Sequence, residues 1–258
     1  MNLFKQFFKS LYSPKDIALF RFQGIGKTIG YVFLLTLLSV LPTIYFFGTT
    51  LKSGIETARP VIQNEFPSFK ISDGQLKTNS NVPITVNKNN FTIIIDSTGA
   101  VSQTELSDRK DTLAFLKNKF VISGGGRIQA YPYSMLNQVK VSNKQLLDFI
   151  DGIENNITTI ISVISVFIFL FACAASFVEV SVLAVIGLFL RNLTGKKLNY
   201  SQLWRMAAYS ETLPTVFFTI MAVLQTKVQN EVLINWFVAA VVLLLSIKEI
   251  PKPKNKLD

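Results

Sequence analysis

The chain has 258 residues, of which 49% are apolar and only 16% are charged. Soluble domains usually carry about 25% charged residues, so this composition favours a membrane protein. The sequence contains no histidine and one cysteine, Cys173, which excludes an intramolecular disulfide and a histidine-based metal or catalytic centre. No catalytic, cofactor-binding or metal-binding residue is predicted.

Residues 1–27 form a basic segment ahead of the first long apolar block and begin with "MNLFKQFFKSLYS". The leucines and phenylalanines of this stretch recur at helical spacing, with Lys5 and Lys9 elsewhere on the helical wheel. The pattern predicts a short helix that lies in the cytoplasmic interface of a membrane. Ser13 followed by Pro14 predicts the start of a second helix.

Four apolar blocks are candidates for membrane-spanning helices, because a span requires about 20 apolar residues. They cover residues 28–47, 157–190, 206–226 and 232–247. The second block is 34 residues long and contains no proline, and its only glycine, Gly187, lies near its end. Without a turn signal in its middle, it predicts one helix of roughly 51 Å that crosses the membrane once.

The basic residues gather on one side of the membrane when four crossings are assumed. Residues 1–27, 191–205 and 248–258 hold 13 basic and 3 acidic side chains, a net charge of +10. Residues 48–156 and the loop at 227–231 hold 13 basic and 11 acidic side chains, a net charge of +2. The positive-inside rule then places both termini in the cytoplasm. The excess charge also favours anionic lipid at the cytoplasmic face, and nucleic-acid binding is not expected.

Residues 48–156 differ in composition from the rest and predict a small α+β domain outside the cytoplasm. Residues 82–101 and 119–131 each predict two strands joined by a turn. Residues 107–119 and 142–155 predict helices, and the second is expected to continue into the long apolar block. The predicted fold class is a membrane all-α bundle of four transmembrane helices with an inserted extracytoplasmic α+β domain.

Two glycine-containing motifs were weighed as ligand sites. Residues 24–28, "GIGKT", resemble the end of a phosphate-binding loop, but Arg21 occupies the position of its first glycine and no strand precedes it. No nucleotide is therefore expected. A second motif could bind an anion through backbone N–H groups, although a wide hairpin turn requires the same glycines and is the favoured interpretation. This candidate anion turn comprises Gly124, Gly125, Gly126 and Arg127.

Polar residues interrupt the later apolar blocks, and this candidate polar network comprises Glu179, Arg205, Tyr209, Ser210, Glu211 and Pro214. An ionisable side chain is unfavourable at the centre of a bilayer, so the carboxylates should face protein or water. Glu179 and Glu211 are predicted to meet, with Arg205 or Arg191 as ionic partner. A structural ion pair is the favoured interpretation, and a proton or substrate relay is the alternative. Pro214 is expected to kink its helix.

Residues 193–214, "LTGKKLNYSQLWRMAAYSETLP", resemble the characteristic loop and helix of the Yip-type membrane superfamily. The matching residues are Gly195, Tyr200, Gln202, Arg205, Ala208, Tyr209 and Pro214. The wider chain, with "LYSPKDIALFRFQGIGKTI" and "FPSFKISDGQL", resembles a family of Gram-positive bacterial membrane proteins of unknown function, some of them labelled maltodextrin-utilisation membrane proteins. The resemblance implies a multi-pass plasma-membrane protein and suggests a link to sugar utilisation.

The favoured function is non-enzymatic: an accessory, scaffold or sensor protein that couples the outer domain to partners in the membrane. Other membrane proteins or a second copy of the chain are the expected partners, and no cofactor is expected. A small oligomeric transporter is the first alternative, which solute flux in proteoliposomes would identify. A membrane enzyme acting on lipid or a lipid-linked substrate is the second, and it would require acidic residues gathered at one interface.

Overall fold

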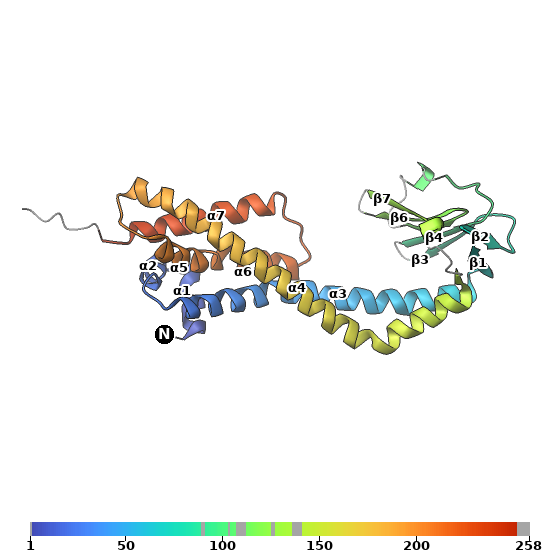
Figure 1. The fold of residues 1–258 in the computed structure, drawn as a ribbon, viewed down its shortest axis with the longest axis horizontal. Coiled ribbons are helices and arrows are strands. Elements are labelled where there is room, and N and C mark those ends of the chain that lie inside the picture. The colour runs from blue at the N-terminus through green and yellow to red at the C-terminus, as the bar shows by residue number, and fades with distance from the viewer. Residues whose placement is uncertain are drawn as a thin grey trace, which may run out of the picture. The chain divides into compact units, whose positions relative to one another are not determined.

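The computed structural model describes residues 2–88, 91–102, 104–106, 112–124, 127–135 and 141–251. The chain divides into two compact units, shown with their elements labelled in Figure 1. The helical unit consists of Met1–Thr49 and Ile161–Asp258, and the strand unit consists of Thr50–Ile160. Each unit has its own hydrophobic core and is described by itself.

The helical unit contains five complete helices and parts of two longer ones. The complete helices are α1 (Leu3–Tyr12), α2 (Pro14–Phe20), α5 (Tyr200–Ser210), α6 (Thr212–Val223) and α7 (Glu231–Lys248). The longer helices, α3 (Ile25–Asn64) and α4 (Asn143–Thr194), begin or end in the strand unit. Four helical stretches are long and apolar enough to cross a membrane, namely α3, α4, α7 and residues 200–223. At this level of length and composition, the four predicted spans are confirmed.

Helix α4 settles how the long apolar block folds, because its 52 residues form one helix without an internal break. It ends where Gly195 adopts a φ of +68°, which a residue with a side chain rarely does. The N–H groups of Gly195 and Lys196 donate to the carbonyls of Asn192 and Arg191 at 3.2 and 3.1 Å, which satisfies the last turn. The prediction of a single long helix is therefore confirmed.

The core of the helical unit lies where α4 approaches α5 and α7 closely. A Cβ atom placed at Gly187 would meet side-chain carbons of Leu203 and Leu243 at 3.2 Å each, so this glycine permits the approach. Most of the opposite surface of α4 is apolar and uncovered, with Phe171 74% exposed. An apolar surface of this size on a long helix is typical of contact with lipid.

In the N-terminal arm, residues 2–24, two polar side chains of α1 face inward and two aromatic side chains face outward. Ser13 ends α1 and accepts a hydrogen bond from the Asp16 N–H as the cap of α2, so the predicted second helix start is confirmed. Gln6 and Ser10 are buried, whereas Phe4 and Phe8 are more than 60% exposed. α1 is therefore an amphipathic helix, as predicted, and its exposed face is the aromatic one.

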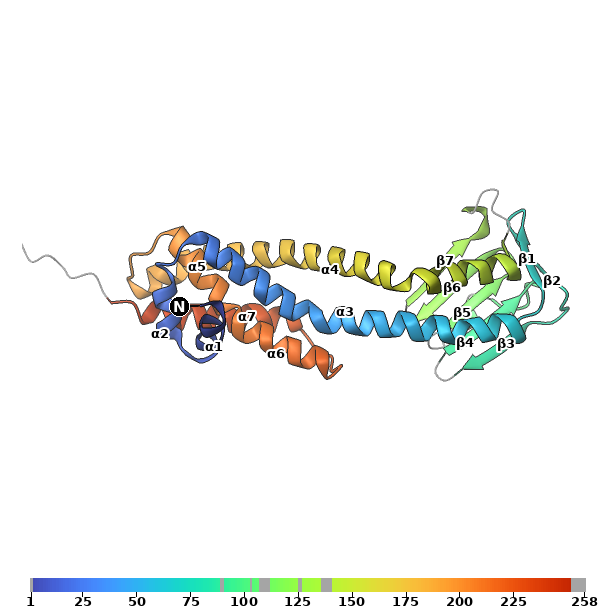
Figure 2. The same cartoon turned by 90° about the horizontal axis from the view of Figure 1, so that it is seen from below.

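The strand unit contains a three-stranded sheet in the order β2-β1-β8 and a five-stranded sheet in the order β3-β4-β5-β6-β7. Its strands are β1 (Phe69–Ser72), β2 (Gln75–Thr78), β3 (Ile84–Lys88), β4 (Phe91–Asp96), β5 (Thr112–Leu116), β6 (Lys119–Gly124), β7 (Arg127–Pro132) and β8 (Val141–Ser142). The two predicted strand pairs, β3 with β4 and β6 with β7, are confirmed as antiparallel neighbours. The five-stranded sheet lies beside the end of α3 (Figure 2). Val61 of α3 belongs to the same buried cluster as Val86 of β3 and Ile93 of β4.

The prediction of a helix over residues 107–119 is wrong. Residues 107–111 lie outside the described residues, and Thr112–Leu116 form β5, which pairs in parallel with β4 and antiparallel with β6. Ala114 and Leu116 are buried in the centre of the sheet, and pairing on both edges outweighs the helical preference of the local sequence. The other predicted helix is confirmed, because α4 begins at Asn143 and Ser142 caps its first turn.

Within the strand unit, α3 and α4 pack together through apolar residues spaced by four, three and four positions. This spacing is the heptad pattern of a coiled coil. The contacting residues are Leu51, Ile55, Ala58 and Ile62 on α3 and Leu146, Ile150, Ile153 and Ile157 on α4. Arg59 adds partly exposed ion pairs to Asp151 at 3.1 Å and Glu154 at 2.8 Å. These residues form a small core of the helix pair, which Leu146 and Phe66 connect to the core of the three-stranded sheet.

Replacing Ile150 with alanine should open this helix pair. Ile150 is only 7% exposed, and Ile→Ala in a packed core costs about 2–5 kcal/mol. Hydrogen exchange measured by mass spectrometry in detergent should therefore become faster in residues 51–62 and 146–157. The matched control is Lys144→Ala, since Lys144 is exposed on the same helix. Equal exchange rates in the two variants would show that the pair contributes no local stability.

Candidate functional site

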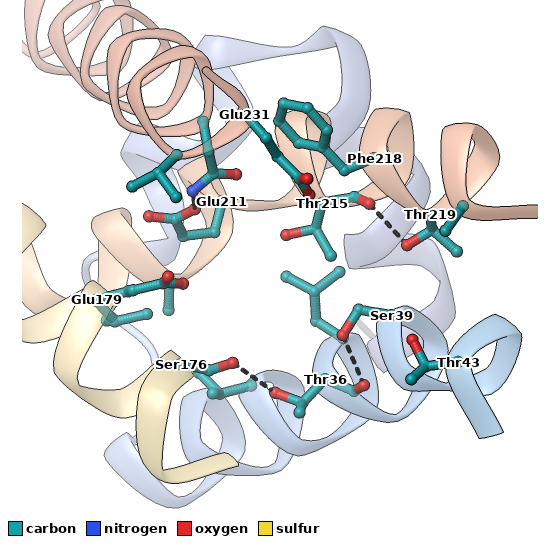
Figure 3. Close-up of a pocket in the computed structure, with 17 residues that line it drawn as sticks. Thr36, Ser39, Thr43, Ser176, Glu179, Glu211, Thr215, Phe218, Thr219 and Glu231 are labelled. Carbon is teal, nitrogen blue, oxygen red and sulfur yellow. Dashed lines mark hydrogen bonds between the residues drawn. The ribbon is translucent and has the colours of Figure 1, made fainter. Parts of the chain in front are cut away.

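The helical unit contains a cavity of about 300 Å³ between α3, α4, the α5–α6 pair and α7 (Figure 3). Its polar lining is rich in carboxylates and hydroxyls, and among the described residues that line it there is no lysine or arginine. The polar residues are Thr36, Ser39, Thr43, Ser176, Glu179, Glu211, Thr215, Thr219, Glu231 and Asn235. We refer to it as the acidic cavity.

The acidic cavity lies beside a break in the third candidate span. α5 ends at Ser210 and α6 begins at Thr212, so Glu211 occupies the junction. Pro214 explains the break, because it has no N–H to donate to the Ser210 carbonyl and its ring crowds that carbonyl. The kink predicted from Pro214 is thus present as an interruption of the helix one turn before the proline.

Glu211 is the most buried carboxylate of the cavity, with only 5% of the residue exposed. Its Oε2 atom accepts a hydrogen bond of 3.4 Å from Nδ2 of Asn235 on α7. Its Oε1 atom is buried and has no hydrogen-bond partner among the residues that the structure describes. An ionised carboxylate in such surroundings is strongly unfavourable unless a cation or a further donor approaches it.

Glu179 on α4 faces the same cavity as Glu211, and the sequence-based prediction that the two meet is consistent with their positions in Figure 3. The predicted ion pair with Arg205 or Arg191 is not formed, because neither carboxylate has a basic group within ion-pair distance among the described residues. The cavity therefore gathers like charges without a compensating cation.

The two arginines make other contacts. Arg205 Nη1 donates to the Arg21 carbonyl at 2.8 Å, and Arg191 donates to the Leu198 carbonyl. Arg205 precedes Glu211 by six residues, which corresponds to about 240° around a helix, so the two side chains leave α5 in different directions. Spacing along the sequence was a poor guide to this pair for that reason.

Hydroxyl residues of the cavity were not selected as site residues from the sequence. On α3 they form a stripe at spacings of three and four, Thr36, Ser39 and Thr43. On α6, Thr215 and Thr219 continue the same spacing from Thr212, which lies outside the cavity lining. Such a stripe in an otherwise apolar helix marks one face, and this signal would have found them. Thr36 Oγ1 donates to Ser176 Oγ at 3.0 Å, which joins α3 to α4 at the cavity wall.

The acidic cavity is closed at one end and open at the other. Ala208 and Val180, with exposures of 0% and 2%, close it near Glu211. Thr43, Ala222 and Glu231 are exposed and line its other end. Ala222 lies eleven residues after Glu211, about 16 Å along a helix, so the cavity opens towards the loop that joins α6 to α7.

The remaining residues of the candidate polar network belong to a second cluster. The Tyr209 hydroxyl lies 3.0 Å from Gln6 Oε1 and 3.1 Å from Gln23 Oε1, and the Tyr31 hydroxyl lies 2.5 Å from Thr212 Oγ1. The rings of Tyr31 and Tyr209 are packed with centroids 4.2 Å apart. We call these residues the tyrosine cluster. Through Gln6 and Gln23 it fastens the N-terminal arm to α5, and through Tyr31 it joins α3 to the start of α6. Ser210 donates back to the carbonyl of Met206 at 3.0 Å.

Two further expectations concern other parts of the chain. The candidate anion turn joins β6 to β7, but Gly125 and Gly126 lie outside the described residues, so it stays a prediction. Among the residues that the structure describes, no group of three or more cysteine, aspartate and glutamate side chains is arranged to hold a metal ion.

The fold and the acidic cavity define a class of protein: a chain with four helices suited to crossing a membrane, a polar cavity among them and a separate strand-rich unit. The chain belongs to the family described as "protein of unknown function (DUF1189)", whose match extends over residues 4–247. Comparison with curated proteins and with solved structures gives no match.

Replacing Tyr209 with phenylalanine should loosen the N-terminal arm. The change removes the hydroxyl that contacts the buried Gln6 and the half-buried Gln23, and one such hydrogen bond contributes about 0.5–1.5 kcal/mol. Limited proteolysis in detergent should cut residues 2–24 faster than in the original protein. Tyr200→Phe is the control, because the Tyr200 hydroxyl is more exposed and makes one long contact of 3.4 Å. Unchanged cleavage of the arm in Tyr209→Phe would contradict this role.

Proposed function

We propose that the protein is an integral plasma-membrane accessory or sensor protein that couples an extracytoplasmic domain to partners in the membrane. In this proposal α3, α4, the α5–α6 pair and α7 cross the bilayer, and both termini are cytoplasmic. The net charge of +10 on residues 1–27, 191–205 and 248–258 supports this orientation. The strand unit and the open end of the acidic cavity then belong to the outer side.

The observation that carries the proposal is the way in which the chain passes between its two units. Both connections, near residues 49–50 and 160–161, lie inside the continuous helices α3 and α4 rather than in loops. A flexible loop would uncouple two units, whereas a helix transmits rotation and translation of its ends. In this proposal, the packed pair of α3 and α4 is the element that changes between two arrangements when a signal passes.

The resemblances to the Yip-type superfamily and to Gram-positive membrane proteins with a sugar-utilisation label fit this proposal. They suggest that the partners are membrane proteins of the envelope or of sugar uptake, and homo-oligomers are a further arrangement of the same kind. Anionic lipid at the cytoplasmic face is proposed from the basic residues of the loop and tail.

A small oligomeric transporter is the second candidate, and the acidic cavity is the observation that favours it. A carboxylate pair at membrane depth commonly marks a substrate or proton pathway. Four crossings provide few helices for a complete pathway, so transport would require several copies of the chain.

The two candidates are separated by comparing partner recovery with solute flux. The tagged protein is purified from its host membranes in mild detergent, beside a variant with Ile55→Asp and Ile150→Asp, which places charges in the helix pair. An accessory protein should bring a membrane partner in fixed stoichiometry, the variant should lose it, and the pure protein should show no flux in proteoliposomes. Lys144→Asp is the matched control on the exposed face of α4.

The opposite result would favour transport. It consists of a protein recovered without a partner that conducts a cationic solute across proteoliposomes, with flux abolished in Glu179→Gln and Glu211→Gln variants that still fold.

A further inference from the structure

We propose that the acidic cavity binds a small organic cation, a primary ammonium group on a hydroxyl-bearing body, with the ammonium held between Glu179 and Glu211. This inference concerns the ligand of the cavity and goes beyond the accessory role, which it neither requires nor replaces. It depends on four observations: the charge of the lining, the unpartnered oxygen of Glu211, the volume, and the distribution of hydroxyl groups.

The charge of the lining fixes the sign of the ligand. Three carboxylates, of Glu179, Glu211 and Glu231, line the cavity, and none of its described lining residues is basic. Two polar groups lie near Glu211 on neighbouring helices, Glu179 on α4 and Asn235 on α7. Neither of them carries a positive charge. An anionic ligand would add to this repulsion, whereas a cation would relieve it.

Glu211 provides the second and independent observation. Its side chain is aimed into the cavity (Figure 3). Only 5% of the residue is exposed, and Oε1 has no partner in the described part of the chain. An ammonium group has three N–H donors and can serve Oε1 of Glu211 while it donates to Glu179. Charge-assisted hydrogen bonds of this kind are roughly twice as strong as neutral ones.

The volume distinguishes an organic cation from a bare metal ion. The cavity holds about 300 Å³, roughly ten times the share of one water molecule in the liquid. Ligand pockets for small molecules begin at about this size. Among the described residues, the three carboxylates of the cavity do not converge as a group that could hold a metal ion.

The hydroxyl groups indicate what the rest of the ligand carries. Thr36, Ser176, Thr215 and Thr219 line the space between the buried carboxylate and the open end. Each hydroxyl oxygen offers acceptor positions that suit an O–H or N–H donor of the ligand. Phe218 and aliphatic side chains cover the remaining wall, which favours a short carbon skeleton over a fully hydrated ion.

An ammonium group of this type has two sources, a water-soluble amine and the ethanolamine headgroup of a lipid. Both would enter at the open end near Ala222 and Glu231, where the lining is exposed. The shared chemistry is the primary ammonium, so the experiment uses free ethanolamine as probe and varies the lipid separately.

The test is equilibrium dialysis of radiolabelled ethanolamine against the purified full-length protein in nanodiscs of phosphatidylglycerol. We expect saturable binding of one ethanolamine per chain, unaffected by an equal concentration of glycerol or sodium chloride. Glu211→Gln should weaken binding at least tenfold, and Glu249→Gln, on the exposed end of α7, should leave it unchanged. Glu179→Gln, at a half-buried position, gives the same readout if Glu211→Gln does not fold.

A second experiment repeats the measurement in nanodiscs that contain phosphatidylethanolamine. A rise in the apparent Kd for free ethanolamine would identify the lipid headgroup as a competing occupant. An unchanged Kd would identify the soluble amine as the ligand. Either result supports the proposed site. Absence of saturable binding, equal binding by Glu211→Gln and the original protein, or displacement by sodium would overturn the proposal. Because this assay uses the purified protein alone, its result is independent of whether a membrane partner is recovered.

Discussion

A carboxylate placed among apolar helices must face a cation, hydrogen-bond donors or water, because the alternative is an uncompensated charge in a medium of low polarity. Glu211 meets this constraint through its position at the junction of α5 and α6, where the helix is interrupted and a cavity adjoins it. The hydroxyl stripes of α3 and α6 continue the polar surface from Glu211 to the open end. Apolar side chains on the outer faces of the same helices remain available to lipid.

Polar side chains of the N-terminal arm also need hydrogen-bond partners where they turn towards the helices. Gln6 and Gln23 turn inward to the Tyr209 hydroxyl, and the Tyr31 hydroxyl reaches Thr212, directly after the helix break. The arm is therefore joined to α5, the helix that ends next to Glu211, while Phe4 and Phe8 are exposed. This arrangement links the position of Glu211 to the first helix of the chain through hydrogen bonds rather than through ion pairs.

The features that the sequence predicted well depend on local patterns. The unbroken α4, the start of α2 at Pro14 and the strand pair β3–β4 each follow from composition and spacing over a few residues. The features that it missed depend on contacts between distant segments. β5 is a strand because β4 and β6 pair with it, and Arg205 contacts the arm because it faces away from Glu211. Sequence spacing could identify Glu179 and Glu211 as unusual within apolar helices, but not that Arg205 and Arg191 make other contacts.

The most direct test of this account is the accessibility of Thr219, which lines the acidic cavity, and of Lys196, in the loop after α4. Each is replaced by cysteine in a Cys173→Ala background and treated in intact cells with a membrane-impermeant maleimide. The account predicts labelling of the cysteine at position 219, its protection by ethanolamine, and labelling at position 196 only after permeabilisation. Labelling at position 196 in intact cells, with position 219 unreactive, would contradict both the orientation and the outward-facing cavity.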